Sequence, residues 1–406
     1  MRPKLQAAAS LLVFTALGLC SAFAQSKYDV GASDSEIKIG NILAYSGPVS
    51  SLGVIGKVEA AYFKKISDEG GINGRKINFI SYDDAYSPPK TVEQARKLIE
   101  SDEVLLIFNP VGTPTNAAIQ KYMNSKKVPQ LLVGGGATRW NNPAEFPWTM
   151  GFQPNYQTEG RIFAKYILKA KPDARIAVLY QNDDLGKDYL KGLKDGLGSK
   201  SSMIIMEESY EISEPTIDSH IVKMRASGAD VFISIALPKG AAQSIRKVSE
   251  IGWKPLFILS SIGASIGTVI RPAGFENAQG IISTAYLKDP SDPQWANDEA
   301  KQRFDAFIAK YAADVDKNDY FVVYAYVISQ TMVKVLDQCG NNLTRANIMQ
   351  QASSLRDFKP EMLLPGIVIN TSPSDFAPMK DMRTVRLQGE RWETFGDAMS
   401  SSDPGN

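Results

Sequence analysis

A regular alternation of short apolar strand patterns and amphipathic helix patterns constrains the fold of this chain more than any other feature. Strand patterns at 37–43, 76–82 and 104–108 are each followed by a helix pattern, and the apolar run 131–133 then ends in three glycines. Strict alternation of strand and helix predicts a parallel sheet with helices on both faces. In such sheets, ligands bind in the loops beyond the carboxyl ends of the strands.

The same alternation starts again after Pro154. A helix pattern comes first, and further strand patterns lie at 175–180, 203–207, 231–235 and 256–259. Two similar halves in tandem favour two doubly wound parallel-sheet lobes with a cleft between them over one continuous sheet. The expected fold class is therefore α/β. Past residue 286 the chain changes to long helix patterns and two short strand patterns, at 296–311, 320–338, 344–353, 366–369 and 382–387.

Three loops that follow strand patterns in the first half are candidates for a ligand site, namely 44–52, 110–116 and 134–140. In the last loop, Gly134 to Gly136 let backbone N–H groups approach a bound group, and Thr138 adds a hydroxyl. The glycines are equally compatible with a simple turn of the chain. They do not form a dinucleotide-binding fingerprint, because its third glycine would fall on Arg139.

Residues 1–24 have the layout of a secretory signal peptide. A basic start precedes the apolar stretch 11–19, and the sequence at 22–24 fits a small-x-small cleavage site. We expect an exported, soluble periplasmic protein, because no later apolar run approaches the roughly 20 residues that span a bilayer. Cys20 gives only a weak lipoprotein signal, since Leu19 stands where such a signal has a small residue.

The net charge and the few reactive side chains argue against nucleic acid binding, nucleophilic catalysis and metal binding. The sequence has 45 basic and 44 acidic residues, so the mature chain without Arg2 and Lys4 carries a charge of about −1, and nothing suggests nucleic acid binding. Past the signal, Cys339 is the one cysteine, and it is typical of a small residue at a helix end. The one histidine, His220, lies in a polar stretch. We therefore expect no nucleophile–base pair, no metal-ligand cluster and no cofactor.

Five motifs in matching order and spacing carry a resemblance to a known family. They are Ser46-Gly47-Pro48, 70–75, Asp83-Asp84, 134–138 and 180–186. The mature chain resembles the periplasmic solute-binding proteins of ABC importers of the branched-chain amino acid (leucine/isoleucine/valine-binding protein) type. The resemblance implies a periplasmic binding protein type I fold, in which two lobes joined by a three-strand hinge close on the ligand.

The resemblance also implies that each lobe is assembled from two separate parts of the chain. Lobe 1 would comprise 34–155 and 286–365, lobe 2 would comprise 156–285 and 366–395, and 396–406 would form a tail. The three crossings of the hinge would lie near 154–157, 284–287 and 364–370.

Loops of both lobes supply the candidate ligand site. In amino-acid-binding relatives, the loops that match 112–115 and 136–138 hold the ligand's carboxylate and ammonium. Independently of the family, Thr113 and Thr115 at a helix start provide a seat for an anion. The candidate ligand-binding residues are Leu52, Gly112, Thr113, Thr115, Gly136, Ala137, Thr138, Leu185, Ala236, Leu237, Ile262, Tyr286 and Phe321.

The second lobe departs from the pattern of amino-acid binders. Relatives place an acidic side chain against the ammonium just after the strand that matches 256–259, where this chain has Ser260, Ser261 and Ile262. Leu185 replaces an aromatic residue, and the tyrosine of the next loop falls near Ala236 and Leu237. A buried, unpaired ammonium would cost several kcal/mol, so we expect a ligand other than a simple α-amino acid.

An anion seat facing an apolar wall predicts an aromatic or aliphatic carboxylic acid as the ligand. Tyr286, Phe321 and Trp140 are candidates to stack on a ring. The alternatives are a short amide, urea, or a branched-chain or other amino acid, for which Asp184 or a tyrosine hydroxyl would supply the polar contact.

We expect a monomeric binding protein without catalytic activity, whose partners are the small-molecule ligand and the permease and ATPase subunits of an ABC importer. A periplasmic enzyme that uses Asp183 and Asp184 is one alternative, although these carboxylates are more typical of a helix cap. A ligand-sensing subunit of a membrane receptor is the other.

Overall fold

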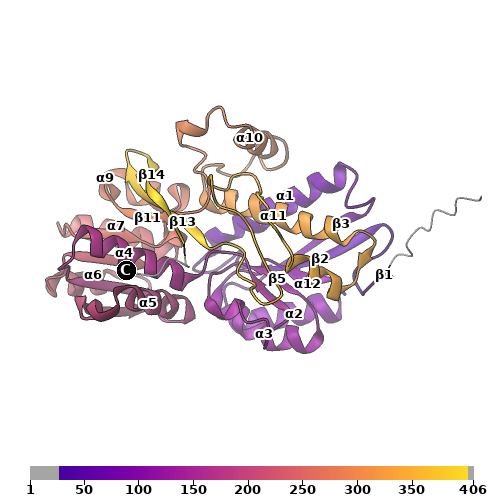
Figure 1. Ribbon diagram of the computed structural model, residues 1–406, viewed down its shortest axis with the longest axis horizontal. Helices are drawn as coiled ribbons and strands as arrows, with labels where there is room; N and C mark the ends of the chain where they lie inside the picture. The colour runs from indigo at the N-terminus through magenta and orange to yellow at the C-terminus, as the bar shows by residue number, and fades with distance from the viewer. Residues whose placement is uncertain (1–26, 401–406) are drawn as a thin grey trace, which may run out of the picture.

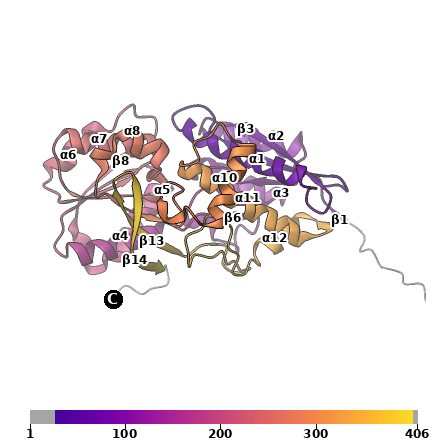
Figure 2. The ribbon, with the colours of Figure 1, turned by 90° about the horizontal axis from the view of Figure 1, so that it is seen from above.

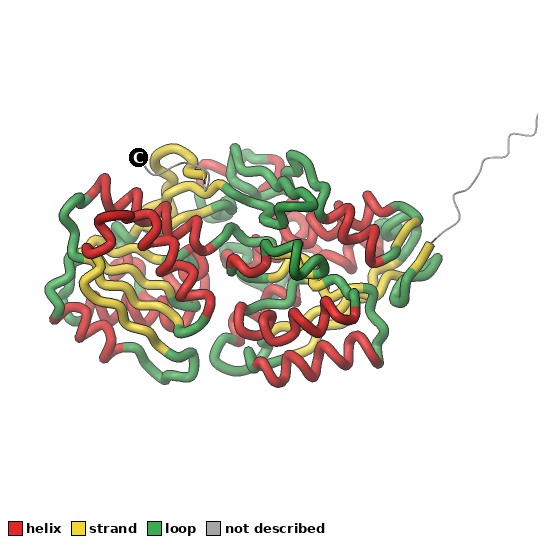
Figure 3. Tube along the Cα trace, turned by 60° about the horizontal axis from the view of Figure 1, so that its bottom comes forward, coloured by secondary structure: helices red, strands yellow, loops and turns green. Residues whose placement is uncertain are grey.

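The computed structural model describes residues 27–400, which form two lobes lying side by side (Figure 1). Each lobe contains one large β-sheet with helices on both of its faces (Figure 3). The predicted α/β class with two doubly wound lobes is confirmed. The predicted signal peptide at 1–24 and residues 401–406 of the predicted tail lie outside the described residues.

Lobe 1 is built on a fully parallel five-stranded sheet in the order β3-β2-β4-β5-β6. Its strands are β2 (Glu36–Leu43), β3 (Lys76–Asp83), β4 (Leu106–Phe108), β5 (Gln130–Val133) and β6 (Thr149–Gly151). Helices α2 (Pro88–Glu100) and α3 (Thr113–Lys126) pack together over one face, where Leu98, Ile107 and Met123 share a buried cluster. Strand β4 and residues 131–133 of β5 are apolar without interruption because both faces of the sheet are covered.

Helices from the C-terminal part of the chain return to lobe 1. The long helix α11 (Tyr320–Cys339) packs against α1 (Val54–Asp68), and α10 (Glu299–Tyr311) and α12 (Arg345–Ala352) flank the pair (Figure 2). Helix α11 is buried along most of its length, which explains why its sequence is apolar on more than one face. Strand β1 (Lys27–Tyr28) pairs with β12 (Asn342–Leu343) just past the end of α11.

Lobe 2 is built on a seven-stranded sheet in the order β14-β13-β11-β10-β9-β7-β8. The two faces of β7 carry alternate residues, so Ile176 and Val178 are buried in one cluster while Ala177 and Leu179 are buried in the other. The parallel strands are β7 (Ile176–Gln181), β8 (Ile204–Tyr210), β9 (Val231–Ile235), β10 (Leu256–Leu259) and β11 (Ile282–Ala285). The helices are α4 (Tyr156–Ala170), α5 (Asp184–Leu197), α6 (Asp218–Ala226), α7 (Pro238–Glu250), α8 (Arg271–Ala273) and α9 (Phe275–Ala278).

An antiparallel hairpin completes the edge of the lobe 2 sheet. Strand β13 (Asp381–Gln388) pairs with β11 and with β14 (Arg391–Ser400), which the sequence pattern did not predict. The turn between them contains Gly389 at φ +61°, a conformation that glycine adopts without strain. The tail expected to start at residue 396 therefore starts within a strand.

Three connections join the lobes in the described chain, between β6 and α4, between β11 and α10, and between α12 and β13. The prediction of a strand at 366–369 is wrong, because in this segment only Ile369 forms an isolated bridge, with Phe358. Pro365 lacks an N–H donor and Gly366 has φ +89°, so the chain turns before a ladder can form.

Side-chain caps fix where three helices begin beside the boundary between the lobes. Asn155 accepts a hydrogen bond from the N–H of Gln157 in α4, and Asp319 accepts one from the N–H of Phe321 in α11. Asp183 accepts from the N–H of Leu185 at 2.9 Å and thereby caps α5, as predicted. Caps of this kind stabilise a helix by about 1 kcal/mol.

Candidate functional site

A cleft between the lobes gathers loops that follow the carboxyl ends of strands in both sheets. The empty space between its walls, part of which is open to solvent, is about 410 Å³. Its lining residues are Leu52, Ile55, Tyr86, Val111, Gly112, Thr113, Gly134, Gln153, Tyr156, Leu185, Leu237, Ile262, Phe321 and Tyr324. The position agrees with the general rule that ligands bind doubly wound sheets at this edge.

Seven of the thirteen residues predicted for the site line this cleft. They are Leu52, Gly112, Thr113, Leu185, Leu237, Ile262 and Phe321. Lobe 1 and α11 contribute four of them, and the aliphatic side chains of Leu185, Leu237 and Ile262 form the lobe 2 wall. The structure thus brings together the apolar wall expected from the sequence.

The predicted residues Gly136, Ala137 and Thr138 do not line the cleft, although Gly134 of the same loop does. A side chain at Gly136 would meet the carbonyl oxygen of Pro154 and the ring of Tyr156. Ala137 borders two separate hollows. The N–H of Thr138 donates to Asp188 at 2.6 Å across the lobe boundary. Residues 136–138 therefore pack against the first crossing and against α5.

Three further predicted residues also point elsewhere. The hydroxyl of Thr115 donates to the carbonyl oxygen of Val111 at 2.9 Å, one helical turn back. Ala236 is fully buried in the core of lobe 2. The hydroxyl of Tyr286 accepts a hydrogen bond from Tyr320 at 2.7 Å. Trp140, a candidate for stacking, lines a separate hollow beside Gly136.

Of the remaining lining residues, Val111 and Gly134 lie in loops selected from the sequence, and the others were not predicted. Two tyrosines are the most informative of the residues that were missed. Tyr86 lies in the loop after β3, which follows the same carboxyl-edge rule as the three loops that were chosen. Tyr156 begins α4 directly after the first crossing between the lobes. Tyr86 could therefore have been predicted from the sequence. Tyr156 could not, because its position depends on the path of the chain between the two lobes.

Two buried hydroxyls at the cleft make no hydrogen bond of standard geometry within the described residues, although Thr113 lies close enough to Tyr156, and Tyr86 to Gln181, for a weak polar interaction. They are the Oγ1 atom of Thr113 and the phenolic oxygen of Tyr86. A buried, unsatisfied hydroxyl costs about 1–3 kcal/mol, so such groups usually meet a ligand or a water molecule. Burial raises the pKa of Tyr86 and of Tyr156 well above the usual value, which keeps both phenols protonated and able to donate.

Gly112 holds the loop before α3 in a conformation that only glycine adopts readily. Its φ is +112°, and a Cβ atom there would lie 2.6 Å from both the Thr115 hydroxyl and the Tyr86 ring. The backbone can therefore pass between these two side chains. The following residue, Thr113, is the first of α3, and its hydroxyl borders the cleft.

Carboxylates near the cleft accept hydrogen bonds from other groups of the protein. Glu159 accepts hydrogen bonds from the N–H of Ser261 at 2.7 Å and from the hydroxyl of Thr284 at 2.7 Å. Glu59 accepts from the side chains of Asn41 and Asn109. Burial raises the pKa of both carboxyl groups. No Asp, Glu, Lys or Arg is among the described residues that line the cleft.

The comparison with known proteins decides the family. A family model described as periplasmic binding protein matches residues 36–391 of this chain. The chain belongs to this family. The resemblance stated from the sequence motifs is confirmed, and the family consists of solute-binding proteins.

The curated relatives of this periplasmic binding protein are distant. It is 25% identical over 270 residues to the leucine-specific-binding protein of Salmonella typhimurium, covering 65% of this chain and 70% of that protein. It is 24% identical over 273 residues to Leu/Ile/Val-binding protein homolog 7 of Brucella suis, covering 63% of this chain. The match spans 65% of that relative, slightly less than two thirds of its length.

Solved structures share the fold of this binding protein. A branched chain amino acid ABC transporter from Thermus thermophilus with bound valine superimposes with a TM-score of 0.81 at 14% identity, covering 91% of this chain and 98% of that one. The fatty acid ABC transporter substrate-binding protein from Thermomonospora curvata superimposes with a TM-score of 0.77 at 18% identity, covering 93% and 95%. At these identities the likeness establishes the fold.

In this periplasmic binding protein the lobes touch through polar contacts beyond the cleft walls. Arg139 of lobe 1 lies 2.8 Å from Asp184 of lobe 2. The hydroxyl of Ser265 in lobe 2 donates to Asp319 at the start of α11 at 3.0 Å. These contacts join the two lobes outside the cleft lining. Within residues 27–400, no helix is both long and apolar enough to cross a membrane.

Proposed function

We propose that this protein captures a small aromatic or aliphatic carboxylic acid between its two lobes in the periplasm and delivers it to the permease and ATPase subunits of an ABC importer. The observation that carries the proposal is the pair of unsatisfied hydroxyls, Thr113 and Tyr86, at a cleft whose opposite wall is aliphatic. The family supports the capture of a solute, and the chemistry of the two walls supports the class of ligand.

The lobe 1 wall suits the carboxylate of such a ligand. Thr113 and Tyr86 each have a hydrogen to donate, and a carboxylate accepts at two oxygens. Thr113 also begins α3, and the first N–H groups of a helix favour an anion. Hydrogen bonds to a charged acceptor are about twice as strong as neutral ones, so a carboxylate can be held without a basic side chain.

The lobe 2 wall suits an apolar body. Leu185, Leu237 and Ile262 are nearly fully buried, and Phe321 lies on the α11 side of the cleft. Burying apolar ligand surface against these side chains contributes roughly 25 cal/mol per Å². An ammonium group would meet no carboxylate on the lining and would lose its hydration without compensation.

An amino acid ligand is the second candidate. The leucine-specific-binding protein of Salmonella typhimurium and the valine-bound structure from Thermus thermophilus favour it by family likeness. The fatty acid ABC transporter substrate-binding protein from Thermomonospora curvata has the same fold and is named for an apolar acid. A short amide or urea is a further alternative, because hydroxyls also accept hydrogen bonds.

A thermal-shift screen of the purified mature protein tests the proposal. The panel contains benzoate, a phenylpropenoate, medium-chain fatty acids, leucine, valine, an amide and urea. We expect stabilisation by one or more of the acids, with the shift reduced in Thr113→Val and Tyr86→Phe. Tyr122→Phe is the matched control, because its hydroxyl bonds to Glu100 on the outer side of α3. Stabilisation by leucine or valine alone would overturn the assignment of the ligand class.

Two other roles lead to different outcomes. Chemical turnover of the stabilising ligand by the purified protein would indicate a periplasmic enzyme. Uptake of the ligand by cells that lack this protein but keep its importer, combined with a lost response to the ligand, would indicate a sensing subunit. Loss of uptake in such cells is the result expected for delivery to an importer.

A further inference from the structure

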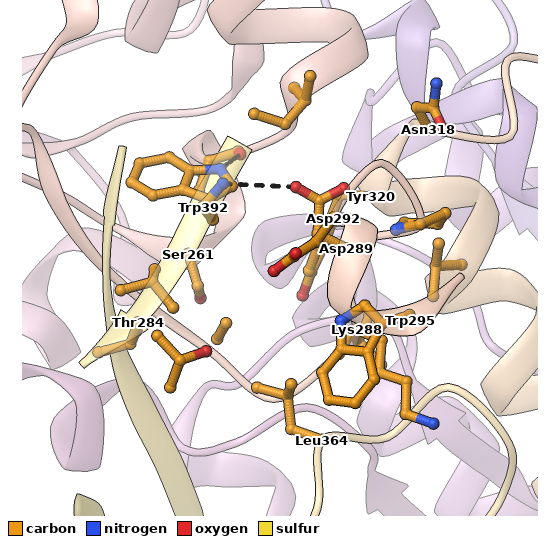
Figure 4. Close-up of a pocket in the computed structure, with 18 of the residues that line it drawn as sticks. Ser261, Thr284, Lys288, Asp289, Asp292, Trp295, Asn318, Tyr320, Leu364 and Trp392 are labelled. Carbon is orange, nitrogen blue, oxygen red and sulfur yellow. Dashed lines mark hydrogen bonds between the residues drawn. The ribbon is translucent and has the colours of Figure 1, made fainter. Parts of the chain in front are cut away.

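A second cavity lies at the hinge and shares no lining residue with the cleft (Figure 4). The empty space between its lining residues, part of which is open to solvent, is about 610 Å³. Its lining comes from the loop after β10, the second crossing, the start of α11, and the β13–β14 hairpin. The two lobes therefore both contribute to it. Neither the sequence patterns nor the proposed capture of an acid in the cleft accounts for this cavity.

Aromatic side chains give the hinge cavity an apolar lining with fixed geometry. The indole of Trp392 donates from Nε1 to the carbonyl oxygen of Ala264 at 2.7 Å, which holds its ring in place. Trp295 lies on another side of the cavity, across the open space from Trp392 (Figure 4). The hydroxyl of Tyr320 is directed to Tyr286, so the ring of Tyr320 is the part left to the cavity.

Asp289 lines the cavity, and one of its two carboxylate oxygens has no short hydrogen bond to the described residues. Its Oδ1 atom accepts hydrogen bonds from the N–H and the hydroxyl of Ser291 at 2.9 and 2.7 Å. Its Oδ2 atom has only a long contact of 3.5 Å with the N–H of Trp392, the dashed line of Figure 4. Burial, together with the neighbouring Asp292, raises the pKa of Asp289.

The basic residue of the lining is already paired. Lys288 lies 2.7 Å from Asp298, and its ammonium also stands 4.9 Å above the Trp295 ring. The second lining carboxylate, Asp292, accepts from the N–H of Gln294 at 3.0 Å. Across residues 27–400, neither Asp289 nor Asp292 takes part in a salt bridge. The cavity thus combines a carboxylate that lacks a cation with two indole rings.

We propose that the hinge cavity is a second ligand site, which binds a small organic cation: an amine that carries an apolar or aromatic group. The ammonium donates to Oδ2 of Asp289, and the apolar group lies between Trp295 and Trp392, whose faces also attract a cation. Because the lining belongs to both lobes, an occupant favours the arrangement in which the lobes are in contact. The proposal does not rest on the ligand proposed for the cleft, because the two cavities share no lining residue.

Fluorine NMR of the full mature protein labelled with fluorotryptophan tests this site. The probe is 2-phenylethylammonium, and 2-phenylethanol is its neutral counterpart of nearly equal shape. Variants that replace Trp295 or Trp392 by Phe assign the two resonances. We expect 2-phenylethylammonium to shift the resonances of Trp295 and Trp392 saturably, with at least tenfold higher affinity than 2-phenylethanol, and to leave that of Trp253 unchanged.

The Asp289→Asn variant separates recognition of the charge from apolar binding. We expect it to bind 2-phenylethylammonium at least tenfold more weakly, whereas the exposed Asp173→Asn control binds as the wild type does. Unchanged resonances of Trp295 and Trp392 in unliganded Asp289→Asn show that this variant is folded, and Asp289→Ser replaces it if they change. Equal affinity for the amine and the alcohol, equal affinity in Asp289→Asn, or no saturable shift up to about 10 mM would overturn the proposal. Loss of the shift in Thr113→Val would also overturn it, because it would place the probe in the cleft.

Discussion

The two walls of the cleft differ in how they use their polar groups. On lobe 1, the hydroxyls of Thr113 and Tyr86 are buried at the cleft and unpaired. On lobe 2, the lining is aliphatic, and the neighbouring carboxylates of Asp183 and Glu159 are directed to backbone N–H groups of their own lobe. Under the proposed function, lobe 1 would therefore orient the polar group of the ligand, and lobe 2 would exclude water from its apolar part.

Substitution of Glu159 should have the largest effect, because this carboxylate of lobe 2 accepts hydrogen bonds within the protein and does not face the ligand. It accepts hydrogen bonds from Ser261, Thr284 and Tyr189. Glu159→Ala leaves these buried donors without partners, and we expect a loss of about 3–5 kcal/mol in the free energy of unfolding. Urea denaturation measures it against the exposed control Glu93→Ala. A loss below about 1 kcal/mol would show that Glu159 is not structural.

The contact between the lobes at Asp319 should make the stability of the protein depend on pH. Burial raises its pKa from 3.8 to about 6, while the unfolded chain keeps the usual value. The folded state therefore binds the proton more tightly, and the stability contributed by protonated Asp319 is complete below pH about 4 and lost as the pH rises through about 6. The groups that face it are the Ser265 hydroxyl, the Phe321 N–H, Arg271 and Asp316.

The measurement is the unfolding free energy of the wild type and of Asp319→Asn between pH 4 and 7. Relative to the variant, the wild type should lose about 2–3 kcal/mol over this range, since one pKa unit corresponds to about 1.4 kcal/mol. Two parallel profiles would contradict the assignment of a raised pKa to Asp319.

The lobe 1 hydroxyls test the orienting wall. Thr113→Val and Tyr86→Phe each remove one hydroxyl with little change of shape, and we expect each to weaken binding of the acid by about 1–2 kcal/mol, roughly 5- to 30-fold. Thr115→Val is the matched control on the same helix, because its hydroxyl bonds to Val111. Isothermal titration with the acid found by screening gives the affinities. Equal losses in Thr113→Val and Thr115→Val would remove Thr113 from the site.

The pair Arg139 and Asp184 should give the smallest effect. Both side chains are partly exposed, at 35% and 54%, although they join the two lobes. Exposed ion pairs contribute about 0–1 kcal/mol, so Asp184→Asn should change ligand affinity less than threefold and less still at high salt. A larger loss in the same titration would mean that this contact, and not the cleft lining, governs closure.

The fold was predictable where the apolar periodicity was strong. The strands at 37–43, 76–82 and 231–235 and the helix at 320–338 agree with β2, β3, β9 and α11 to within a residue or two. The segment 366–369 is apolar, but Pro365 and Gly366 turn it away from any partner strand. Strand β14 lacks such a run, and its pairing with β13 decides its conformation.

The site was predictable at the level of loops and less so at the level of side chains. The rule for carboxyl ends placed Leu52, Thr113 and Leu237 at the cleft. It could not show that the Thr115 hydroxyl bonds one turn back, or that Asp188 of the other lobe takes the N–H of Thr138. Those outcomes depend on contacts between residues far apart in the chain.

The most direct test of the account compares leucine with 4-methylpentanoate, which is leucine without its ammonium group. Both have the same carboxylate and the same branched body, so the difference in their affinities measures how the cleft treats a buried ammonium. With only Leu185, Leu237 and Ile262 on the lobe 2 wall, isothermal titration should show 4-methylpentanoate binding at least about 100-fold more tightly than leucine. Leucine binding as tightly as 4-methylpentanoate, or more tightly, would contradict the account.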